Sequence, residues 1–342
     1  MDATEKAALA RSLAAMGLLG PGEDFAASAL TGGVSCDVYK VEIAGQPVMV
    51  VKRALLRLRV AADWRAAPER TAAEVAWLKL ARRIDPAVAP EILGEDQPHH
   101  MFAMRFLEGL PLWKSELAAG RVDLDFAALT GAKLARLHAA TAGDTAIVRA
   151  FANGRQFFDL RLDAYLLFSA ARHPDLAPKI QAVVNQIAGA RIALMQGDIS
   201  PKNILCGPEG PVFLDAETAC YGDPVFDLAF CINHLLLKCV WHPEYWNEYL
   251  ESFRALKNAY LAGVTWEPPS QTEKRAAILL AMLLLARIDG KSPVEYLIAE
   301  DDRAFVRETA RGFIAQGEES LDTIAEVWRA RLEQRQAGTS IG

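Results

Sequence analysis

The residues best suited to chemistry lie in one short stretch of the chain, residues 195–230. Asp198 is followed by Asn203 in the spacing Asp-x4-Asn, and Asp215 comes directly after a short apolar run at 212–214. A carboxylate can orient a hydroxyl group and take its proton, and carboxylate and amide oxygens are the ligands that Mg²⁺ prefers. Phosphoryl transfer needs both, because the protein holds the reactants in line and neutralises charge on the phosphates. The spacing therefore indicates phosphoryl transfer, although an isolated Asp-x4-Asn is also typical of a capped turn.

The order of motifs in this stretch resembles that of aminoglycoside phosphotransferases and choline kinases, which belong to the protein-kinase-like superfamily. It reads Gly-Asp-x4-Asn, a turn, a strand ending in Asp-x-Glu, and then Tyr-Gly-Asp-Pro-x-Phe-Asp-Leu-Ala. The resemblance implies that Asp198 is the catalytic base and that Asn203 and Asp215 are ligands of Mg²⁺. It further implies that Glu217 is an additional ligand, and that Asp227 is a buried acid that braces the catalytic loop.

One position departs from this family pattern. The family usually has histidine before Gly-Asp, and here Gln196 stands in its place. That histidine commonly supports the loop through hydrogen bonds, and a glutamine side chain can also donate and accept them. We therefore expect an adjusted site that remains active.

A lysine in the front part of the chain fits the same chemistry. Lys52 follows the apolar run 48–51 of a predicted strand, and Glu74 lies on the predicted helix 71–83. By the resemblance, the lysine binds the α- and β-phosphates of ATP and the glutamate steadies it. The alternatives are a solvated lysine at a strand edge and an ordinary acid on a helix surface. The apolar neighbours of Lys52 favour the functional interpretation.

Two further segments are candidates for nucleotide binding. The strands predicted at 34–43 and 48–51 form a hairpin, and Gly32, Gly33 and Ser35 lie in a predicted turn where it begins. Backbone N–H groups in such a turn can cradle phosphates, although two glycines in a turn often serve the turn alone. Beyond the next strand, the resemblance implies that the main chain at Arg105 and Leu107 reads the edge of the adenine.

Two basic residues have weaker claims. Lys202, inside the catalytic turn, either touches the transferred phosphate or faces solvent. Arg287 follows the apolar run 276–286, and a buried arginine needs a partner. That partner is a substrate oxygen or a structural carboxylate, and we favour the carboxylate.

A second resemblance, to 5-methylthioribose kinase, includes the front part of the chain. It rests on a similar layout after the lysine strand and on one later stretch: residues 51–55, 58–60, Trp64, Arg70, Glu74 and 215–222. The chain differs from that enzyme at Asn203, where serine is usual, and at the single Arg287, where a pair of arginines is usual. The likeness covers most of the chain at the level of the fold and leaves the substrate open.

The elements that must position these residues change in character along the chain. Hydrophobic periodicity predicts a short N-terminal amphipathic helix, then a strand-rich part and, after a short hinge, a mostly helical part. The predicted strands are 34–43, 48–51, 100–106, 192–195 and 212–214, and the predicted helices are 71–83, 129–141, 165–171, 179–189, 225–240, 276–286 and 303–315.

This order, together with the resemblance, predicts an α+β, two-lobed, protein-kinase-like fold. The small strand-rich N-terminal lobe, residues 1–106, would bind the nucleotide. The larger helical C-terminal lobe, residues 107–342, would carry the catalytic groups and the substrate. ATP would lie in the cleft between the lobes.

Bulk composition excludes several classes of protein. The chain has 342 residues, of which 52% are hydrophobic and 23% charged, which is typical of a soluble globular protein. The net charge of −6 and the lack of a basic block argue against nucleic-acid binding. The apolar run at 276–286 is too short to cross a membrane. Five scattered cysteines, an odd number without metal-like spacing, fit a reducing cytoplasm.

Together these expectations describe an ATP- and Mg²⁺-dependent phosphotransferase that acts on a hydroxyl group of a small molecule such as an aminoglycoside, an amino alcohol or a sugar. A protein kinase is one alternative, but the chain has no Ala-Pro-Glu segment and only a short stretch between Asp215 and Asp227. Another alternative is a nucleotide-binding pseudo-enzyme with a regulatory role, which Gln196 keeps open. The oligomeric state and the preference for ATP over GTP stay open as well.

Overall fold

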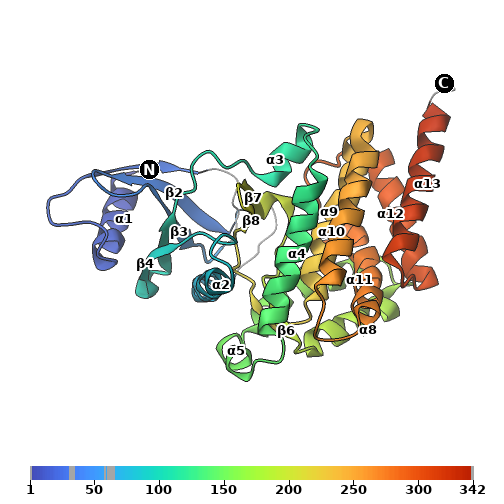
Figure 1. Ribbon diagram of the computed structural model, residues 1–342, viewed down its shortest axis with the longest axis horizontal. Helices are drawn as coiled ribbons and strands as arrows, with labels where there is room; N and C mark the ends of the chain where they lie inside the picture. Colours follow the sequence, from blue (N-terminus) through green and yellow to red (C-terminus); the bar gives the residue numbers. More distant parts are fainter. Residues whose placement is uncertain (1, 31–34, 58, 60–65, 340–342) are drawn as a thin grey trace. The chain divides into compact units, whose positions relative to one another are not determined.

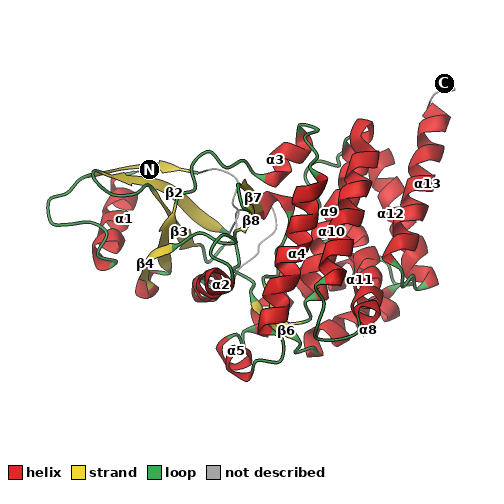
Figure 2. Cartoon of the chain, viewed as in Figure 1, coloured by secondary structure: helices red, strands yellow, loops and turns green. Residues whose placement is uncertain are grey.

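The computed structural model describes residues 2–30, 35–57, 59 and 66–339. Its contacts divide the chain into two compact units. The first unit consists of Met1–Leu110 and Val212–Thr218, and the second of Pro111–Pro211 and Ala219–Gly342. The first unit is rich in strands and the second is largely helical, as Figures 1 and 2 show. The predicted fold class, a strand-rich front followed by a larger helical part, is confirmed.

The first unit is built on a five-stranded sheet in the order β1-β2-β3-β5-β4. Its strands, each antiparallel to its neighbours, are β1 (Phe25–Ala29), β2 (Cys36–Ile43), β3 (Met49–Ala54), β4 (Ile92–Asp96) and β5 (Met101–Arg105). The predicted hairpin of β2 and β3 is confirmed, with Tyr39 opposite Val51. The sequence did not predict β1, because Phe-Ala-Ala-Ser-Ala has little strand propensity of its own and depends on pairing with β2.

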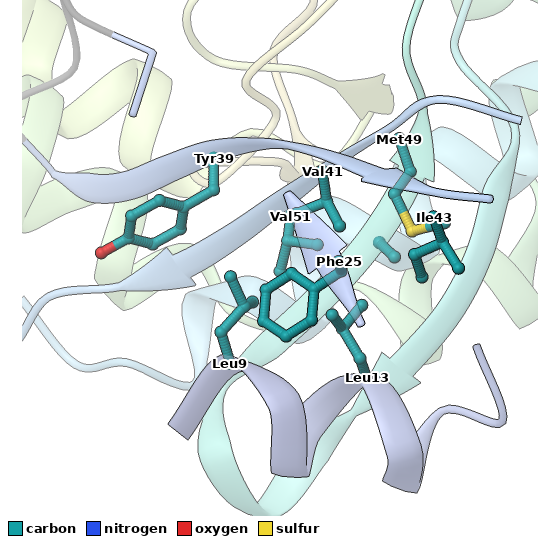
Figure 3. Close-up of a cluster of buried hydrophobic side chains, with 9 residues drawn as sticks. Leu9, Leu13, Phe25, Tyr39, Val41, Ile43, Met49 and Val51 are labelled. Carbon is teal, nitrogen blue, oxygen red and sulfur yellow. The ribbon is translucent and has the colours of Figure 1, made fainter. Parts of the chain in front are cut away.

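Two helices in the first unit pack against this sheet. Helix α1 (Ala3–Ala15) begins with a capping box formed by Asp2 and Glu5. Its Leu9 and Leu13 point into a buried cluster with side chains from β1, β2 and β3, as Figure 3 shows. Truncating a fully buried leucine such as Leu13 to alanine is expected to cost about 3 kcal/mol of stability.

The alternation of side chains along β3 decides where the lysine points. Met49 and Val51 belong to the cluster beneath α1. Successive side chains in a strand point to opposite faces of the sheet, so Val50 and Lys52 face the other way. On that face Lys52 meets α2 (Arg70–Ile84), which packs against β3, β4 and β5.

The second unit is a set of helices with short strands. The helices are α3 (Trp113–Ala118), α4 (Leu124–Thr141), α5 (Thr145–Ala150), α6 (Gly154–Phe157), the π-helical segment η2 (Phe158–Leu167), α7 (Phe168–Arg172), α8 (Ala177–Gly189), α9 (Val225–Trp241), α10 (Trp246–Ala262), α11 (Pro269–Asp289), α12 (Glu300–Gln316) and α13 (Leu321–Thr339). The strands are β6 (Ala193–Met195), β7 (Ile204–Gly207), β8 (Gly210–Phe213), which continues into the first unit, and β9 (Cys220–Gly222). Strands β6 and β9 pair with each other, as do β7 and β8.

Helix α10 packs against both α4 and α9 in the second unit, where Figure 1 shows the three helices. Gly131 of α4 permits the close approach to α10, because a Cβ atom there would lie 2.2 Å from the carbonyl oxygen of Leu256. Helix α9 is buried from Val225 to Val240, so it forms the core of this unit. The sequence predicted α4 and α9 but missed α10 and α13.

No single helix within the described residues is long and apolar enough to cross a membrane. Helix α9 and the segment Pro243–Ala262 meet the length and composition criteria only as a pair, and they are bent by 113°.

Candidate active site

Lys52 is the centre of a charged cluster in the first unit. Its Nζ atom lies 2.7 Å from Oε1 of Glu74 on α2 and 2.8 Å from Oδ1 of Asp215, which follows β8. The Lys52 and Glu74 side chains are buried, whereas the Asp215 side chain keeps 26% of its surface exposed. The structure therefore brings together three residues that the sequence placed in the nucleotide site.

The charges of this cluster support one another. Burial alone lowers the pKa of Lys52, but Asp215 and Glu74 together raise it well above its usual value. Burial raises the pKa of Glu74, and Lys52 opposes that change. Asp215 has a φ angle of +65°, in the left-handed region that few residues other than glycine adopt. Strained backbone of this kind persists where the surrounding structure fixes it, and it often marks a functional position.

Arg70 holds the start of α2 to the segment that carries Asp215. Its Nε atom donates to Oε2 of Glu217 at 2.9 Å, and the ion pair is buried. Its Nη2 atom donates to the carbonyl oxygens of Ser35 at 2.5 Å and Leu55 at 2.7 Å. Since Arg70 precedes Glu74 by four residues, both side chains lie on one face of α2. One oxygen of Glu217, predicted as a metal ligand, is thus held by an arginine.

The first segment predicted to bind the nucleotide through its backbone is the turn with Gly32, Gly33 and Ser35. Gly32 and Gly33 lie outside the described residues. The carbonyl oxygen of Ser35 accepts hydrogen bonds from Arg70 and from the backbone N–H of Leu55, which is 3.0 Å away. Ser35 therefore shapes the turn through its backbone.

The backbone N–H of Arg105 donates to the carbonyl oxygen of Glu91 at 2.8 Å. It is therefore already occupied by strand pairing, and adenine recognition by Arg105 could use only its carbonyl oxygen. The guanidinium of Arg105 forms an exposed ion pair with Glu91. Leu107 follows β5 in a segment without regular secondary structure.

In the second unit, Asp198 is held by three side chains. Asn203, in a single 3₁₀ turn at Pro201–Asn203, donates from Nδ2 to Oδ2 of Asp198 at 2.7 Å and to its carbonyl oxygen at 3.0 Å. Nη2 of Arg161 and Nζ of Lys202 both lie 3.3 Å from the same Oδ2 atom. Asn203, Arg161 and Lys202 all approach Oδ2 of this carboxylate.

Asp227, in the first turn of α9, supports the loop around Asp198. Its two carboxylate oxygens accept from the backbone N–H groups of Gln196 and Gly197, each at 2.7 Å. Nε2 of His138 lies 3.2 Å from Oδ2 of Asp227. Oε1 of Gln196 accepts from the backbone N–H of Asp198, so this glutamine bonds directly into the loop. The arrangement fits the bracing role that the resemblance implies for Asp227.

Arg287 has a different environment from the one we expected. Its Nη1 atom donates to the hydroxyl of Tyr165 at 3.1 Å and to the carbonyl oxygen of Ser292. Within the described residues it forms no ion pair with a carboxylate, so the predicted carboxylate partner is wrong. An aromatic hydroxyl and a backbone carbonyl satisfy part of the guanidinium, and the nearby Glu295 acts on it only at longer range.

The described residues contain no ready-made cluster of metal ligands. No group of three or more His, Cys, Asp or Glu side chains in the described part of the chain could hold a metal ion. A cavity of about 340 Å³ lies beside β6 and β9, and no predicted site residue lines it.

Sequence reasoning missed Arg161 and gave Arg70 no role. Arg161 lies in the run Phe-Phe-Asp-Leu-Arg-Leu-Asp-Ala-Tyr-Leu-Leu-Phe, where a charged residue among apolar ones was a usable signal. For Arg70 the signal was its four-residue spacing from Glu74. The contacts of these arginines with Asp198 and Glu217 join distant parts of the sequence, and no local pattern predicts them.

Comparison with known proteins places the chain in a family. Residues 26–266 match the family model of the phosphotransferase enzyme family, abbreviated APH. The chain therefore belongs to this phosphotransferase family. No curated protein sequence gives a significant match.

Several solved structures share the fold. An ethanolamine kinase from Plasmodium vivax is similar with a TM-score of 0.56 and 12% identity, over 88% of this chain and 86% of that chain. A choline/ethanolamine kinase family protein from Mesorhizobium loti gives 0.51 and 18%, over 97% and 98%. APH(2")-IIa in a ternary complex with streptomycin and ATP gives 0.51 and 14%, over 92% and 98%. At these identities the likeness establishes the protein-kinase-like fold.

Proposed function

We propose that this phosphotransferase transfers the γ-phosphoryl group of ATP to a hydroxyl group of a small molecule, with Mg²⁺ as the metal. The observation that carries the proposal is the position of Lys52, whose Nζ atom lies within 2.8 Å of both Glu74 and Asp215. Residues 1–106 would form the nucleotide-binding lobe and residues 107–342 the catalytic and substrate lobe. The structure of APH(2")-IIa in complex with streptomycin and ATP supports the choice of nucleotide.

The charge balance of the first unit suits a nucleotide with its cation. Lys52 and Arg70 face the carboxylates of Glu74, Asp215 and Glu217, so acids outnumber bases by one. The most exposed of these carboxylates is Asp215, at 26%, compared with 1% for Glu74 and 8% for Glu217. Asp215 is therefore the acid best placed to meet a cation from solvent, and Lys52 is the group that would bind phosphate oxygens.

The metal ligands in this proposal are Asp215 and Asn203. Because the Nδ2 atom of Asn203 donates to Asp198, its remaining polar atom is the carbonyl oxygen that a hard cation requires. Mg²⁺, when bound, supplies charge neutralisation on the phosphate oxygens. Glu217, held by Arg70, is assigned to positioning α2 and Asp215.

Asp198 would act as the general base. Its Oδ2 atom is fixed by Asn203, Arg161 and Lys202, and Oδ1 would accept the proton of the acceptor hydroxyl. The hydroxyl oxygen forms the new bond to the γ-phosphorus while the bond to the β-phosphate bridging oxygen breaks, and ADP leaves. The protein contributes position and charge, which are the main terms in phosphoryl transfer.

The test is a screen of hydroxylated small molecules for acceptor-dependent ADP release, with mass spectrometry to detect a product that has gained one phosphoryl group. We expect one class of acceptor to be phosphorylated, and the reaction to stop when EDTA removes Mg²⁺. Binding of MgATP with no phosphorylated product across a broad panel would contradict catalysis and favour a nucleotide-binding pseudo-enzyme.

A further inference from the structure

The second unit contains a second set of charged side chains, which the proposed chemistry does not use. We call it the cationic cluster: Lys238 and His234 on α9, Arg287 on α11, and the aromatic residues Tyr165, Trp241 and Tyr296 that contact them. The sequence predicted no catalytic or binding role for Lys238 or His234.

Lys238 is the most unusual member of the cationic cluster. Its side chain is buried, with 1% of the residue exposed, and its Nζ atom has no hydrogen-bond partner within the residues that the structure describes. It lies 4.6 Å from the ring centroid of Trp241 and 5.1 Å from that of Tyr296. These rings supply cation–π attraction but no counter-ion. A buried ammonium group without a carboxylate is costly, so the position calls for an anion.

Lys257 shows how the same unit buries a lysine for structural reasons. It is 4% exposed, and its Nζ atom lies 2.6 Å from Oδ1 of Asp322. This pair is complete without a ligand. Lys238 differs from it in the missing carboxylate and in the two aromatic rings.

Two further members of the cationic cluster have polar atoms without partners. Nε2 of His234 and Nε of Arg287 are buried, and neither finds a hydrogen-bond partner in the described residues. The other nitrogen of His234, Nδ1, lies 3.3 Å from the hydroxyl of Tyr296. Burial, followed by the charges of Arg287 and Lys238, holds the pKa of His234 well below its usual value. The charge of Glu295 acts on Lys238 and Arg287, but Glu295 already forms an ion pair with Lys114. The positive charges of Lys238 and Arg287 are therefore not balanced within the cluster.

The cationic cluster is continuous with the proposed catalytic base. Arg161, which holds Oδ2 of Asp198, lies 5.9 Å from the ring centroid of Tyr165. The guanidinium of Arg287 lies 5.3 Å from the same ring. The ring of Phe230 is 5.8 Å from that of Tyr165 and 5.4 Å from that of His234. Tyr165 thus links the side chain that holds Asp198 to Arg287 and, through Phe230, to His234.

We propose that the cationic cluster binds an anionic group, a carboxylate or a phosphate, on the acceptor whose hydroxyl Asp198 activates. This inference rests on the proposed function and narrows its substrate class. Unpartnered nitrogens on Lys238, His234 and Arg287 are donors for such a group, and the aromatic rings form apolar walls beside it. The same charges repel a cationic acceptor, which argues against an amino sugar or an amino alcohol.

A matched set of three small diols tests the inference without knowledge of the natural acceptor. Glycerate, glycerol and 3-amino-1,2-propanediol share a diol and differ in charge, and inorganic phosphate serves as an anion without a hydroxylated carbon chain. Calorimetric titration of the full-length protein is expected to show glycerate and phosphate binding about tenfold or more tightly than the neutral and cationic diols. Equal binding of the three diols, or a preference for the amine, overturns the inference.

The variant Lys238→Met locates the effect. It is expected to reduce anion binding about tenfold or more, whereas Lys257→Met leaves it unchanged. Unchanged anion binding in a folded Lys238→Met protein also overturns the inference. The charge preference of the wild-type protein is measured without any variant, so the test stands even if Lys238→Met does not fold.

Product analysis separates this inference from the proposed function. Anion-selective binding without a phosphorylated product from any acceptor would refute the phosphotransferase reaction and retain the anion site. Phosphorylation of neutral or cationic acceptors without anion binding would retain the reaction and refute the anion site.

Discussion

The cluster around Lys52 and the cationic cluster around Lys238 differ in whether their positive charges have partners. In the first unit, Lys52 lies between two carboxylates, and Arg70 donates to one carboxylate and four backbone carbonyl oxygens. In the second unit, Lys238, His234 and Arg287 have buried nitrogens for which the described residues provide no hydrogen-bond partner. Within the described residues, the cations of the first region are paired with carboxylates, whereas Lys238 and Arg287 of the second region form no ion pair.

This difference follows from the cost of burying charge. A paired and hydrogen-bonded ion recovers much of its lost hydration, whereas an unpaired one does not. The cluster of Lys52 is already paired and ordered, so we propose that it binds phosphates without a large rearrangement. An unpaired buried cation such as Lys238 is expected to lower stability unless an anion binds beside it. The following changes test this comparison, from the largest expected effect to the smallest.

The largest effect is expected for Asp198→Asn. The amide cannot accept the proton of the acceptor hydroxyl, so kcat should fall on the order of 10³-fold. Nucleotide binding should be retained, because the residues proposed to hold the phosphates and the metal are unchanged. Steady-state ADP release with any accepted substrate, together with ATP titration, measures both. Near-normal turnover would show that another group takes the proton.

The next effect is expected for Lys52→Met. Loss of the buried ammonium group leaves Glu74 and Asp215 facing each other without their cation. We expect kcat/KM for ATP to fall about 100-fold. Lys40 on β2 is the matched control, since its more exposed side chain pairs with Glu42 on the same strand. An equal loss in Lys40→Met would point to general destabilisation of the sheet.

A smaller effect, on stability, is expected for Arg70→Met. The change leaves Glu217 as a buried carboxylate without its partner, which should lower the free energy of unfolding by roughly 3 kcal/mol or more. Urea denaturation measures the loss. The control is Arg105→Met, whose ion pair with Glu91 is exposed and should contribute little. Recovery of stability in the double variant with Glu217→Gln would show that the unpaired charge is the cause.

The smallest effect is a gain in stability for Lys238→Met that depends on pH. Burial, followed by the charge of Lys114, lowers the pKa of Lys238 from 10.5 to about 8, with Glu295 opposing. Below about pH 8 the lysine is protonated in both the folded and unfolded states, so the folded state bears the full burial cost, roughly 3 kcal/mol at most.

Between the folded and unfolded pKa values the unfolded chain binds more protons, so the stability of the wild-type protein rises with pH. The advantage of Lys238→Met should therefore be largest below pH 8 and disappear near pH 10.5. Denaturation midpoints at several pH values measure it. A loss of stability at pH 7, as expected for Lys257→Met, would show that Lys238 is satisfied inside the protein.

Much of the fold was predictable because its signals are local. The hairpin of β2 and β3, helix α2 and helix α9 follow from alternation and helical periodicity. Strands β1 and β4 were missed because pairing within the sheet, and not their own composition, makes them strands.

In the candidate site, too, contacts between residues close in sequence were predictable, and contacts between distant segments were not. Asp198 and Asn203 are close in sequence, and their side chains are in direct contact, with Nδ2 of Asn203 2.7 Å from Oδ2 of Asp198. A local spacing was therefore enough to predict that they lie together. The partners of Arg70, Arg161 and Arg287 come from distant segments, so the sequence offered no means to pair them. The carboxylate expected for Arg287 proved wrong for this reason, and the role of Lys238 appears only when its surroundings are seen.

The most direct test of the division between the two regions is calorimetric titration of a non-hydrolysable ATP analogue with Mg²⁺ into wild type, Lys52→Met and Lys238→Met. We predict that nucleotide affinity falls about tenfold or more in Lys52→Met and stays at the wild-type value in Lys238→Met. Unchanged affinity in Lys52→Met, or a comparable loss in Lys238→Met, would contradict the assignment of nucleotide to the first region and acceptor to the second.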